Sequence, residues 1–570
     1  MASYPYSPLK ETYRFFNLLR NDTEIFRLPP SFSDSMQNVA FESDFSQVYF
    51  PIPLKETEIA AALKAVEGCV ASALADLRGG QQRRMIKVNL EKTTCWLMSM
   101  YLAKIGGLSK LDDGVKDLLK DTDLLHSQSD PYRRMAAGLY ATKDPGRYYH
   151  IHGSLDATTT LNMLGLDSYR PDLRTHEDIS NTIERAVMDF TVAQLEDLNN
   201  SNRQAGVEAL KYEDFLQTPH GQVNDNIPPW SVTCLESQTP AIPLLPPTTN
   251  PLRILKGIKV LELCRIIAGL VIGRTLAEYG AEVLKITSPK LSDIPFFQVD
   301  VNMGKHTAEL DLTTPEGRQI FEDLLQQADV ILDGYRPGAF EKLGYGVEAI
   351  TELGKKRGKG YVYVNENCFG FEGEWAHRPG WQQIADCVSG VAWAQGAFLH
   401  PTSPGPIVPP FPMPDYGTGC LGAIAALSEI YHRAVSGGSW HGRTSILSYN
   451  LLLLNAGLYP PGFQAEQRAL VSDKLFGLKH SASPEDVIRA MIEGMKKHFP
   501  HLWDEKWREK WWCEKYRQEV EVVKPVVEIE GVDIGWKRGS RPNGSDEASW
   551  EFGVDEDYQR CDEERSLVFE

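Results

Sequence analysis

The stretch Ile258-Lys-Val-Leu-Glu-Leu-Cys264 has the length and apolar character of a buried strand. A helical segment follows from Ala268 to Tyr279 and ends at Gly280, and Ala281-Glu-Val-Leu-Lys-Ile-Thr287 predicts a second strand. These three segments predict one strand–helix–strand unit.

The same alternation continues further along the chain. Strands are expected at Ala308–Leu312, Ala328–Asp333 and Gly360–Asn365, and Thr313-Thr-Pro-Glu316 has the cap and the proline that open a helix. Alternating strands and helices predict an α/β fold with an open parallel sheet and helices on both faces.

Composition limits the class of protein. The chain has 570 residues, of which 42% are hydrophobic and 24% charged, so it is long enough for two or three domains with cores of their own. Its formal net charge of −18 disfavours nucleic acid or an anionic lipid surface as partners.

Cysteine use and the chain ends predict a cytoplasmic protein. The nine cysteines are dispersed, without a C-x-x-C pair. The first residues lack the layout of a signal peptide, and no apolar run approaches the roughly 20 residues of a membrane span.

A proline-rich stretch at 239–251 predicts a linker that divides the chain. We expect a first unit at 1–238, a Rossmann-like lobe at 252–460 and a segment at 461–544 that packs back on that lobe. The acidic residues 545–570 are expected to be disordered.

The two halves contain partial copies of one unit. Phe50-Pro-Ile-Pro-Leu-Lys-Glu-Thr-Glu58 aligns with Phe411-Pro-Met-Pro-Asp-Tyr-Gly-Thr-Gly419, and an alanine-rich helical stretch follows both. Leu54 stands where the second copy has Asp415. Since leucine is neither nucleophile nor base, only the second copy can carry chemistry at this position.

Asp415 is the candidate nucleophile. It precedes a helix expected at 417–433, whose amides and positive end stabilise a carboxylate. The alternative is a helix-capping aspartate. Gly417 and Gly419 favour the functional interpretation, because they leave bare backbone where a bulky acyl group would need room.

At these motifs the sequence resembles the family III CoA-transferases, also called the CaiB/BaiF family, which includes formyl-CoA and carnitine CoA-transferases and α-methylacyl-CoA racemase. The resemblance extends over about 160 residues in several ordered motifs. They include Leu255-Lys-Gly-Ile-Lys-Val-Leu-Glu-Leu263, Leu276-Ala-Glu-Tyr-Gly-Ala-Glu-Val-Leu-Lys-Ile286, Asn302-Met-Gly-Lys-His306, Arg336-Pro-Gly-Ala-Phe-Glu-Lys-Leu-Gly344 and Pro414-Asp-Tyr-Gly-Thr-Gly419.

The resemblance implies that Asp415 is acylated and then forms an aspartyl-CoA thioester, with coenzyme A as substrate and no metal. It also implies a Rossmann-like CoA-binding lobe interlocked with a smaller α+β domain. The positions it places at CoA are Ile267, Ala268, Gly334, Tyr335, Ala339 and Lys342. We add Lys305 and Arg336 as cations for the phosphates; the alternative for each cation is a solvated surface charge.

Three departures from the family pattern affect these expectations. Ser288 replaces an arginine that is frequent after the second strand, which leaves Lys290 as the nearest substitute. Trp381 follows Gly380 where racemases have a catalytic histidine, which argues against racemisation. The small-domain sequence lies upstream, around Arg147–Leu155, so we expect the halves to complete one site as an internal pseudo-dimer, or the chain to form a homodimer.

His150 and His152 alternate on a strand and could suggest a metal site. Without a nearby third ligand we assign no metal and expect the pair to border the acyl pocket.

The sequence thus predicts a CoA-transferase that moves CoA from an acyl-CoA to a carboxylic acid. One alternative is an acyl-CoA isomerase, racemase or dehydratase on the same fold. The other is an inert CoA-binding or scaffold protein.

Overall fold

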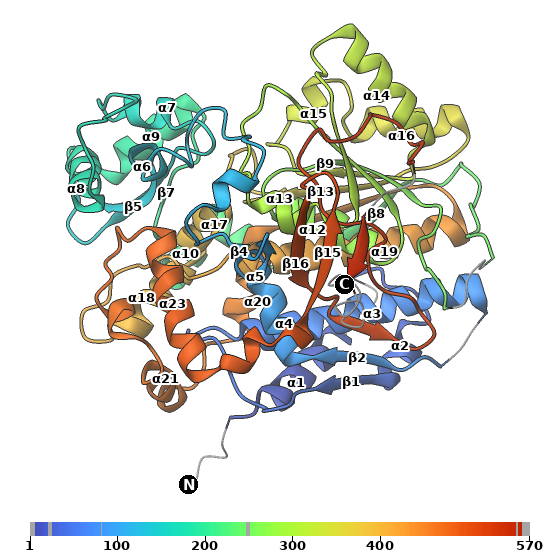
Figure 1. The fold of residues 1–570 in the computed structure, drawn as a ribbon, viewed down its shortest axis with the longest axis horizontal. Helices are drawn as coiled ribbons and strands as arrows, with labels where there is room; N and C mark the ends of the chain where they lie inside the picture. The colour runs from blue at the N-terminus through green and yellow to red at the C-terminus, as the bar shows by residue number, and fades with distance from the viewer. Residues whose placement is uncertain (1–5, 21–24, 81–82, 247–250, 554–556, 561–570) are drawn as a thin grey trace, which may run out of the picture.

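The computed structural model describes residues 6–20, 25–80, 83–246, 251–553 and 557–560. Its centre is a seven-stranded sheet in which every strand but β8 is parallel to its neighbour, so the predicted α/β class is confirmed (Figure 1). In spatial order the strands are β11 (Lys305–Glu309), β10 (Glu282–Thr287), β9 (Lys259–Leu263), β12 (Val330–Asp333), β13 (Val362–Asn367), β14 (Ser439–Ser445) and β8 (Trp230–Glu236).

The six parallel strands follow the order of a doubly wound dinucleotide-binding sheet, in which the chain starts in the middle and winds outward in both directions. The reversal lies between β9 and β12. The loops after these two strands diverge there and leave a crevice at the carboxyl edge of the sheet, where ligands of such folds bind.

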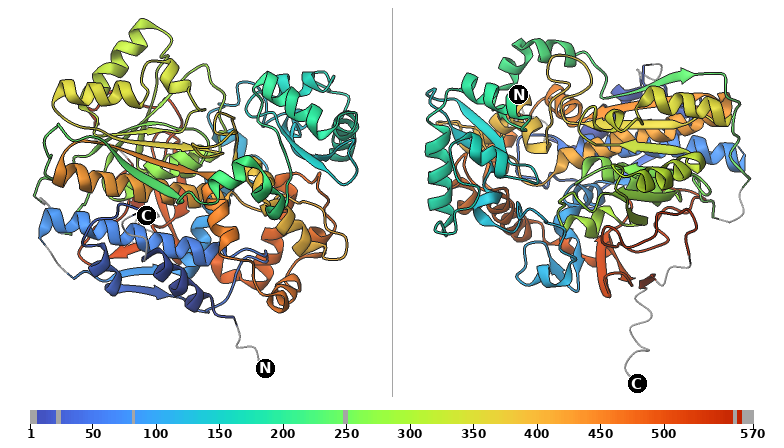
Figure 2. Two further views of the ribbon diagram at one scale, coloured as in Figure 1. Left: turned by 180° about the vertical axis from the view of Figure 1, so that it is seen from behind. Right: turned by 90° about the horizontal axis from the view of Figure 1, so that it is seen from above.

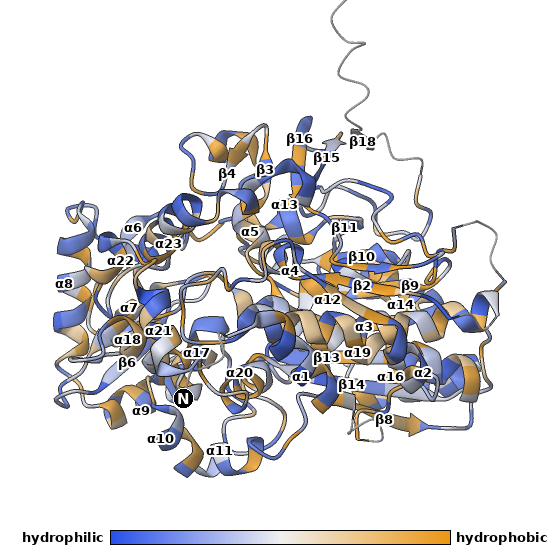
Figure 3. Ribbon diagram, turned by 90° about the horizontal axis from the view of Figure 1, so that it is seen from below, coloured by the Kyte–Doolittle hydropathy of each residue, from blue (hydrophilic) through white to orange (hydrophobic). Residues whose placement is uncertain are grey.

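Helices cover both faces of the sheet. One face carries α12 (Ala268–Glu278) and α19 (Met413–Ser436), and the other carries α14 (Pro315–Gln327) and α16 (Val347–Arg357). The predicted cap of α14 is present, since the Thr314 hydroxyl accepts a hydrogen bond from Gly317 N at 3.1 Å. Hydrophobic residues concentrate in the central strands and in the helices beside them (Figure 3).

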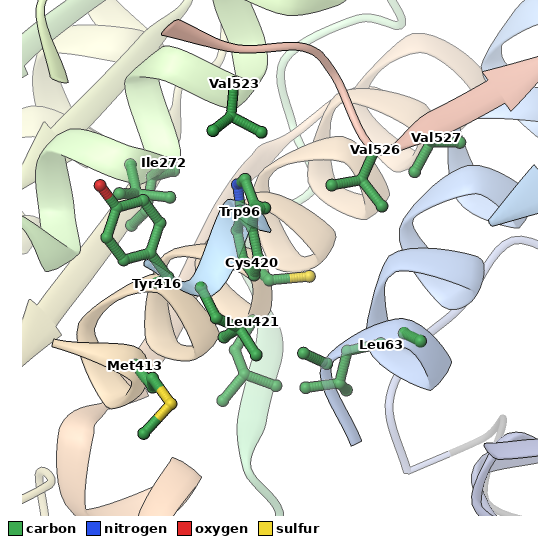
Figure 4. Packing of buried hydrophobic residues seen from close by; sticks show 14 of the residues in the cluster. Leu63, Trp96, Ile272, Met413, Tyr416, Cys420, Leu421, Val523, Val526 and Val527 are labelled. Carbon is green, nitrogen blue, oxygen red and sulfur yellow. The ribbon is translucent and has the colours of Figure 1, made fainter. Parts of the chain in front are cut away.

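The first half of the chain forms the next layers. Helix α3 (Glu56–Gly79) packs along α19, and a small sheet of β1 (Val39–Glu42), β2 (Ile86–Asn89) and β17 (Val527–Ile529) lies near α3. Leu63 of α3, Cys420 and Leu421 of α19 and Val527 belong to one core (Figure 4).

The two segments that resemble each other in sequence have the same local structure. Each is a helix of 24 residues, α3 or α19, followed by a strand and a shorter helix: β2 and α4 (Leu90–Leu97), or β14 and α20 (Ile446–Asn455). Duplication, pseudo-dimer and homodimer stay predictions.

A smaller lobe stands to one side of the main sheet (Figure 2). Its antiparallel sheet and its helices enclose a separate hydrophobic core. The elements are α6 (Pro131–Arg134), β5 (Ala137–Ala141), β6 (Tyr148–His152), α7 (Thr158–Met163), α8 (His176–Val187), α9 (Val192–Asn202) and β7 (Val207–Glu208).

The C-terminal part is interleaved with the rest of the chain. A five-stranded sheet joins β18 (Tyr558–Arg560), β15 (Arg508–Cys513) and β16 (Gln518–Val523) to β3 (Lys104–Ile105) and β4 (Leu108–Ser109). Helices α17 (Gln382–Ser389), α18 (Val391–Leu399), α21 (Pro461–Arg468) and α23 (Pro484–His498) lie below the small lobe in the view of Figure 1.

Two sequence expectations differ from the structure here. Residues 1–238 are not a separate unit, because β8 completes the main sheet by pairing antiparallel with β14. Residues 545–553 are ordered rather than disordered: Trp550 is buried against the sheet and its indole donates to Leu324 O at 3.1 Å. The expectation for 554–556 and 561–570 lies outside the described residues.

Within the described part of the chain, no helix is both long and apolar enough to cross a bilayer.

Candidate active site

Asp415 lies in the first turn of α19, at the carboxyl edge of the main sheet. The helix begins at Met413, four residues before the predicted start. No side chain caps it, and among the described residues no donor to the Asp415 carboxyl is present, which removes the capping interpretation. Asp415 is nevertheless only 8% exposed. A buried carboxyl without a hydrogen-bond partner points to a ligand.

Neighbouring side chains fix the start of α19 in place. Tyr416 donates a hydrogen bond of 2.6 Å to Asp300, which also accepts one of 2.6 Å from Ser99 and pairs with Arg274 at 3.3 Å. The Tyr416 ring packs edge-on against Trp96 of α4 (Figure 4). The first half of the chain therefore positions the candidate nucleophile of the second half.

Asp415 stands between two cavities. The wide cavity, of about 500 Å³, follows the switch point of the sheet and is lined by the loops after β9 and β12. The narrow cavity, of about 110 Å³, lies toward the small lobe. Six residues line both: Ser154, Leu155, Ile266, Ile267, Trp381 and Asp415.

Most of the residues expected at CoA line the wide cavity together with Asp415. They are Ile267, Ala268, Gly334, Tyr335, Arg336 and Ala339. They come from two loops separated by more than 60 residues of sequence, which the parallel order of β9 and β12 brings together. Ser154 and Leu155 of the small lobe complete the wall, so both halves of the chain contribute to one cavity.

Lys305 and Lys342 do not lie in this cavity. Lys305 is fully buried, pairs with Glu262 at 2.7 Å and donates to Leu270 O at 2.7 Å. Burial lowers its pKa to about 8 and Glu262 opposes that shift. Lys342 is exposed on α15 (Ala339–Lys342), which begins at the cavity edge. Lys305 therefore belongs to the ionic core of the sheet, contrary to our expectation of a phosphate ligand.

Gly417 and Gly419 serve helix packing rather than access for an acyl group. A Cβ on Gly417 would lie 2.0 Å from the Tyr449 ring, and one on Gly419 would lie 2.5 Å from Val271 of α12. Neither glycine lines the cavities at Asp415. Our expectation for these two residues was wrong because it considered only the residue's own backbone and not the helices packed against it.

Several cations line the wide cavity. Arg336, Lys290 and Arg265 are among them, and sequence reasoning missed Arg265 although it lies two residues after β9. Partial desolvation, and after it the neighbouring Arg265 guanidinium, lower the pKa of Arg336. Two adjacent guanidinium groups suit an anion such as a phosphate. Lys290, the expected substitute for the arginine absent at Ser288, pairs with Asp311 at 2.6 Å.

Two further carboxyl groups influence Asp415. Burial raises the pKa of Asp415 well above its usual range, and Glu366 and then Asp386 raise it further. Glu366 lines the wide cavity, and burial followed by the Asp333 charge raises its pKa to about 8. Sequence reasoning missed Glu366; the signal was the polar run Asn365-Glu-Asn367 at the end of a predicted strand.

Trp381 and His152 line the cavities beside Asp415. The Trp381 indole donates to the Ser154 hydroxyl at 2.9 Å, and its ring stacks on His152 with the centroids 5.8 Å apart. His152 lines the narrow cavity, whereas His150 does not. Among the described residues no cluster of three or more His, Cys, Asp or Glu side chains is arranged to hold a metal ion.

Comparison with known proteins identifies the family. Residues 255–468 match CoA-transferase family III. The chain is 32% identical over 440 residues to "acetyl-coenzyme A transferase nodX" of Hypoxylon pulicicidum, an alignment that covers 75% of this chain and 74% of that protein. The chain belongs to CoA-transferase family III.

Other members show the same likeness. An "acyl-CoA transferase" of Gibberella moniliformis is 34% identical over 430 residues, 74% of each chain. Among solved structures, Rv3272 from Mycobacterium tuberculosis aligns with a TM-score of 0.39 and 19% identity, over 52% of this CoA-transferase and 98% of that chain.

Proposed function

We propose that this enzyme transfers CoA from an acyl-CoA to a carboxylic acid through covalent intermediates on Asp415. The observation that carries the proposal is the position of Asp415, a buried carboxyl without a partner at the junction of two cavities. In this arrangement the wide cavity takes CoA, with its phosphates at Arg265 and Arg336, and the narrow cavity takes the acyl group.

The proposed reaction uses these positions in the following steps. An Asp415 oxygen attacks the thioester carbon, the carbon–sulfur bond breaks, and an aspartyl mixed anhydride and CoA thiolate result. The thiolate then attacks the Asp415 carbonyl carbon, which releases the donor acid and leaves an aspartyl-CoA thioester. The acceptor carboxylate attacks the carbonyl carbon of this thioester, the carbon–sulfur bond breaks, and a second mixed anhydride and CoA thiolate result. The thiolate then attacks the acyl carbon of the acceptor, which forms the new acyl-CoA and releases the Asp415 carboxylate. The thioester bond is conserved throughout, so no nucleotide is consumed.

The test is intact-protein mass spectrometry after mixing the enzyme with a panel of acyl-CoAs, with hydroxylamine or borohydride trapping. We expect an adduct on the wild type that Asp415→Asn abolishes. Glu366→Gln is the matched control, because it removes a neighbouring carboxyl that lines the same cavity and should keep the adduct. An adduct that survives Asp415→Asn would refute Asp415 as the nucleophile.

One observation favours a second candidate, an isomerase or racemase that moves a proton. His152 borders the narrow cavity, and burial lowers its pKa well below the usual range, so its ring is neutral beside the acyl position. Its Nδ1 accepts a hydrogen bond from Ser154 N at 3.0 Å, so the ring proton is on Nε2, from which it could be donated to an acyl carbon. Deuterium uptake into an acyl-CoA in D₂O without any acceptor acid would support this candidate over transfer.

A further inference from the structure

A third cavity continues from the narrow one, away from the wide cavity. This side cavity, of about 560 Å³, shares five lining residues with the narrow cavity: Lys110, Gln128, Arg134, Ile294 and Glu485. The three cavities therefore form a row, with Asp415 at the first junction and Lys110, Arg134 and Glu485 at the second.

The narrow cavity is too small for a large acyl group. At about 110 Å³ it lies well below the roughly 300 Å³ at which small-molecule pockets begin. Any acid longer than a few carbons that reaches Asp415 from this side must extend elsewhere. The side cavity lies in that direction and has the volume of a complete ligand pocket.

The lining of the side cavity indicates the chemistry of its occupant. Apolar side chains from separate parts of the chain form much of its wall, among them Leu111, Leu119, Met135 and Phe296. Such a wall suits a hydrocarbon body. The wall brings together the small lobe, the segment at 110–121 and α23, so no single element of the sequence reveals it.

The second junction is suited to the passage of a carboxylate. Glu485 binds Lys110 at 3.2 Å and Arg134 at 3.2 Å, so the two cations exceed the one acid by a single positive charge. An entering carboxylate meets a surplus positive charge there, which offsets part of its desolvation.

We propose that the side cavity holds the hydrocarbon body of the carboxylic acid substrate, so that the enzyme acts on extended acids with apolar bodies. This inference rests on the proposed transfer reaction at Asp415.

The test fills the side cavity and compares acids of different length. Leu119→Trp adds bulk at the cavity wall on a half-buried residue, and Leu118→Trp is the matched control, since Leu118 is the adjacent half-buried leucine outside the lining. With the acyl-CoA that labels Asp415 as donor, kcat/KM is measured for acetate, octanoate and hexadecanoate as acceptors. We expect Leu119→Trp to lower the value for hexadecanoate at least tenfold, with acetate changed less than twofold, and Leu118→Trp to change neither.

The outcomes separate the inference from the reaction. Suppose that Leu119→Trp still transfers CoA to acetate and that its ratio of kcat/KM for hexadecanoate to kcat/KM for acetate equals the wild-type ratio. This result overturns the side-cavity proposal and leaves the transfer reaction intact. Transfer to no acid at all in the wild type overturns the reaction itself. If Leu119→Trp also loses acetate transfer, Leu111→Trp at a second position of the same wall decides by the same ratio.

Discussion

At the scale of single residues, the site is defined by carboxyl groups that oppose one another's ionisation. In the proposed reaction Asp415 must lose its proton before it attacks the thioester, yet burial, Glu366 and Asp386 all raise its pKa. Burial raises the pKa of Asp386 to about 7, although hydrogen bonds from Asn450 and Gln382 oppose the shift. The helix N-terminus at Asp415 acts in the other direction, because its positive end favours the anion.

This balance predicts the pH dependence of the reaction. Since only ionised Asp415 is a nucleophile, kcat/KM should rise with pH through an acid limb set by its raised pKa. Glu366 carries its negative charge only above its pKa of about 8, so Glu366→Gln should lower the pKa of Asp415 and move the limb to lower pH in the alkaline part of the profile. Profiles of kcat/KM measured from about pH 5 to pH 9 check this shift.

The control for this profile is Glu374→Gln, which removes an exposed carboxyl from the same region and should leave the limb in place. A limb that stays fixed in Glu366→Gln, or moves to higher pH, would contradict the electrostatic account.

At the scale of elements, close helix contacts hold Asp415 at the carboxyl edge of the sheet. Helix α19 lies against α12, α20 and α3, and the absence of side chains at Gly417 and Gly419 permits this approach. Tyr449 of α20 occupies the space beside Gly417 and donates to Glu56 of α3 at 2.8 Å. One glycine thus determines the spacing of three helices.

Gly417→Ala should therefore destabilise the protein although alanine is the better helix former. Its Cβ would lie 2.0 Å from the Tyr449 ring, and overpacking of this kind costs about 1–3 kcal/mol. Urea denaturation should show a lower midpoint with an unchanged slope. The control is Gly462→Ala in α21. The Cβ added there has no neighbouring atom of another described residue within 4 Å, so this variant should be neutral or slightly stabilising. Equal midpoints for the two variants would disprove the packing role.

At the scale of the whole molecule, buried polar contacts join the halves of the chain. Lys64 and Glu67 of α3 form a fully buried pair at 2.7 Å. Glu67 also accepts a hydrogen bond from Tyr279 at 3.0 Å and contacts Cys420, both from the second half. The halves therefore share one core and should unfold together.

Lys64→Met should cost about 3–5 kcal/mol, because it leaves the Glu67 carboxylate buried without its cation. Replacing both residues in Lys64→Met/Glu67→Leu should recover most of that loss, since an apolar pair avoids the unpaired charge. Thermal and urea unfolding measure both variants. Lys87→Met, which breaks a half-exposed pair with Glu42, should change stability by less than about 1 kcal/mol. A double variant as unstable as Lys64→Met alone would contradict this interpretation.

The sequence by itself predicted the parallel sheet, its five strands from β9 to β13 and Asp415 as the candidate nucleophile. These features are local. They are apolar runs of strand length, a threonine cap and short motifs, and each predicts the same local structure whichever distant elements pack against it. The loops after β9 and β12 could be assigned to one site for the same reason, since parallel strands bring their carboxyl ends to one edge.

Only the tertiary structure decided the partners of these residues. Lys305 was expected at a phosphate, but it pairs with Glu262. Gly417 was expected to leave room for an acyl group, but that room is occupied by Tyr449. Trp550 was expected in a disordered tail, but it is buried on the sheet. Strand β16 pairs with β3, about 400 residues earlier in the chain. Local periodicity carries no information about such distant contacts, because the desolvation of a charge and the room beside a glycine depend on the elements that pack against them.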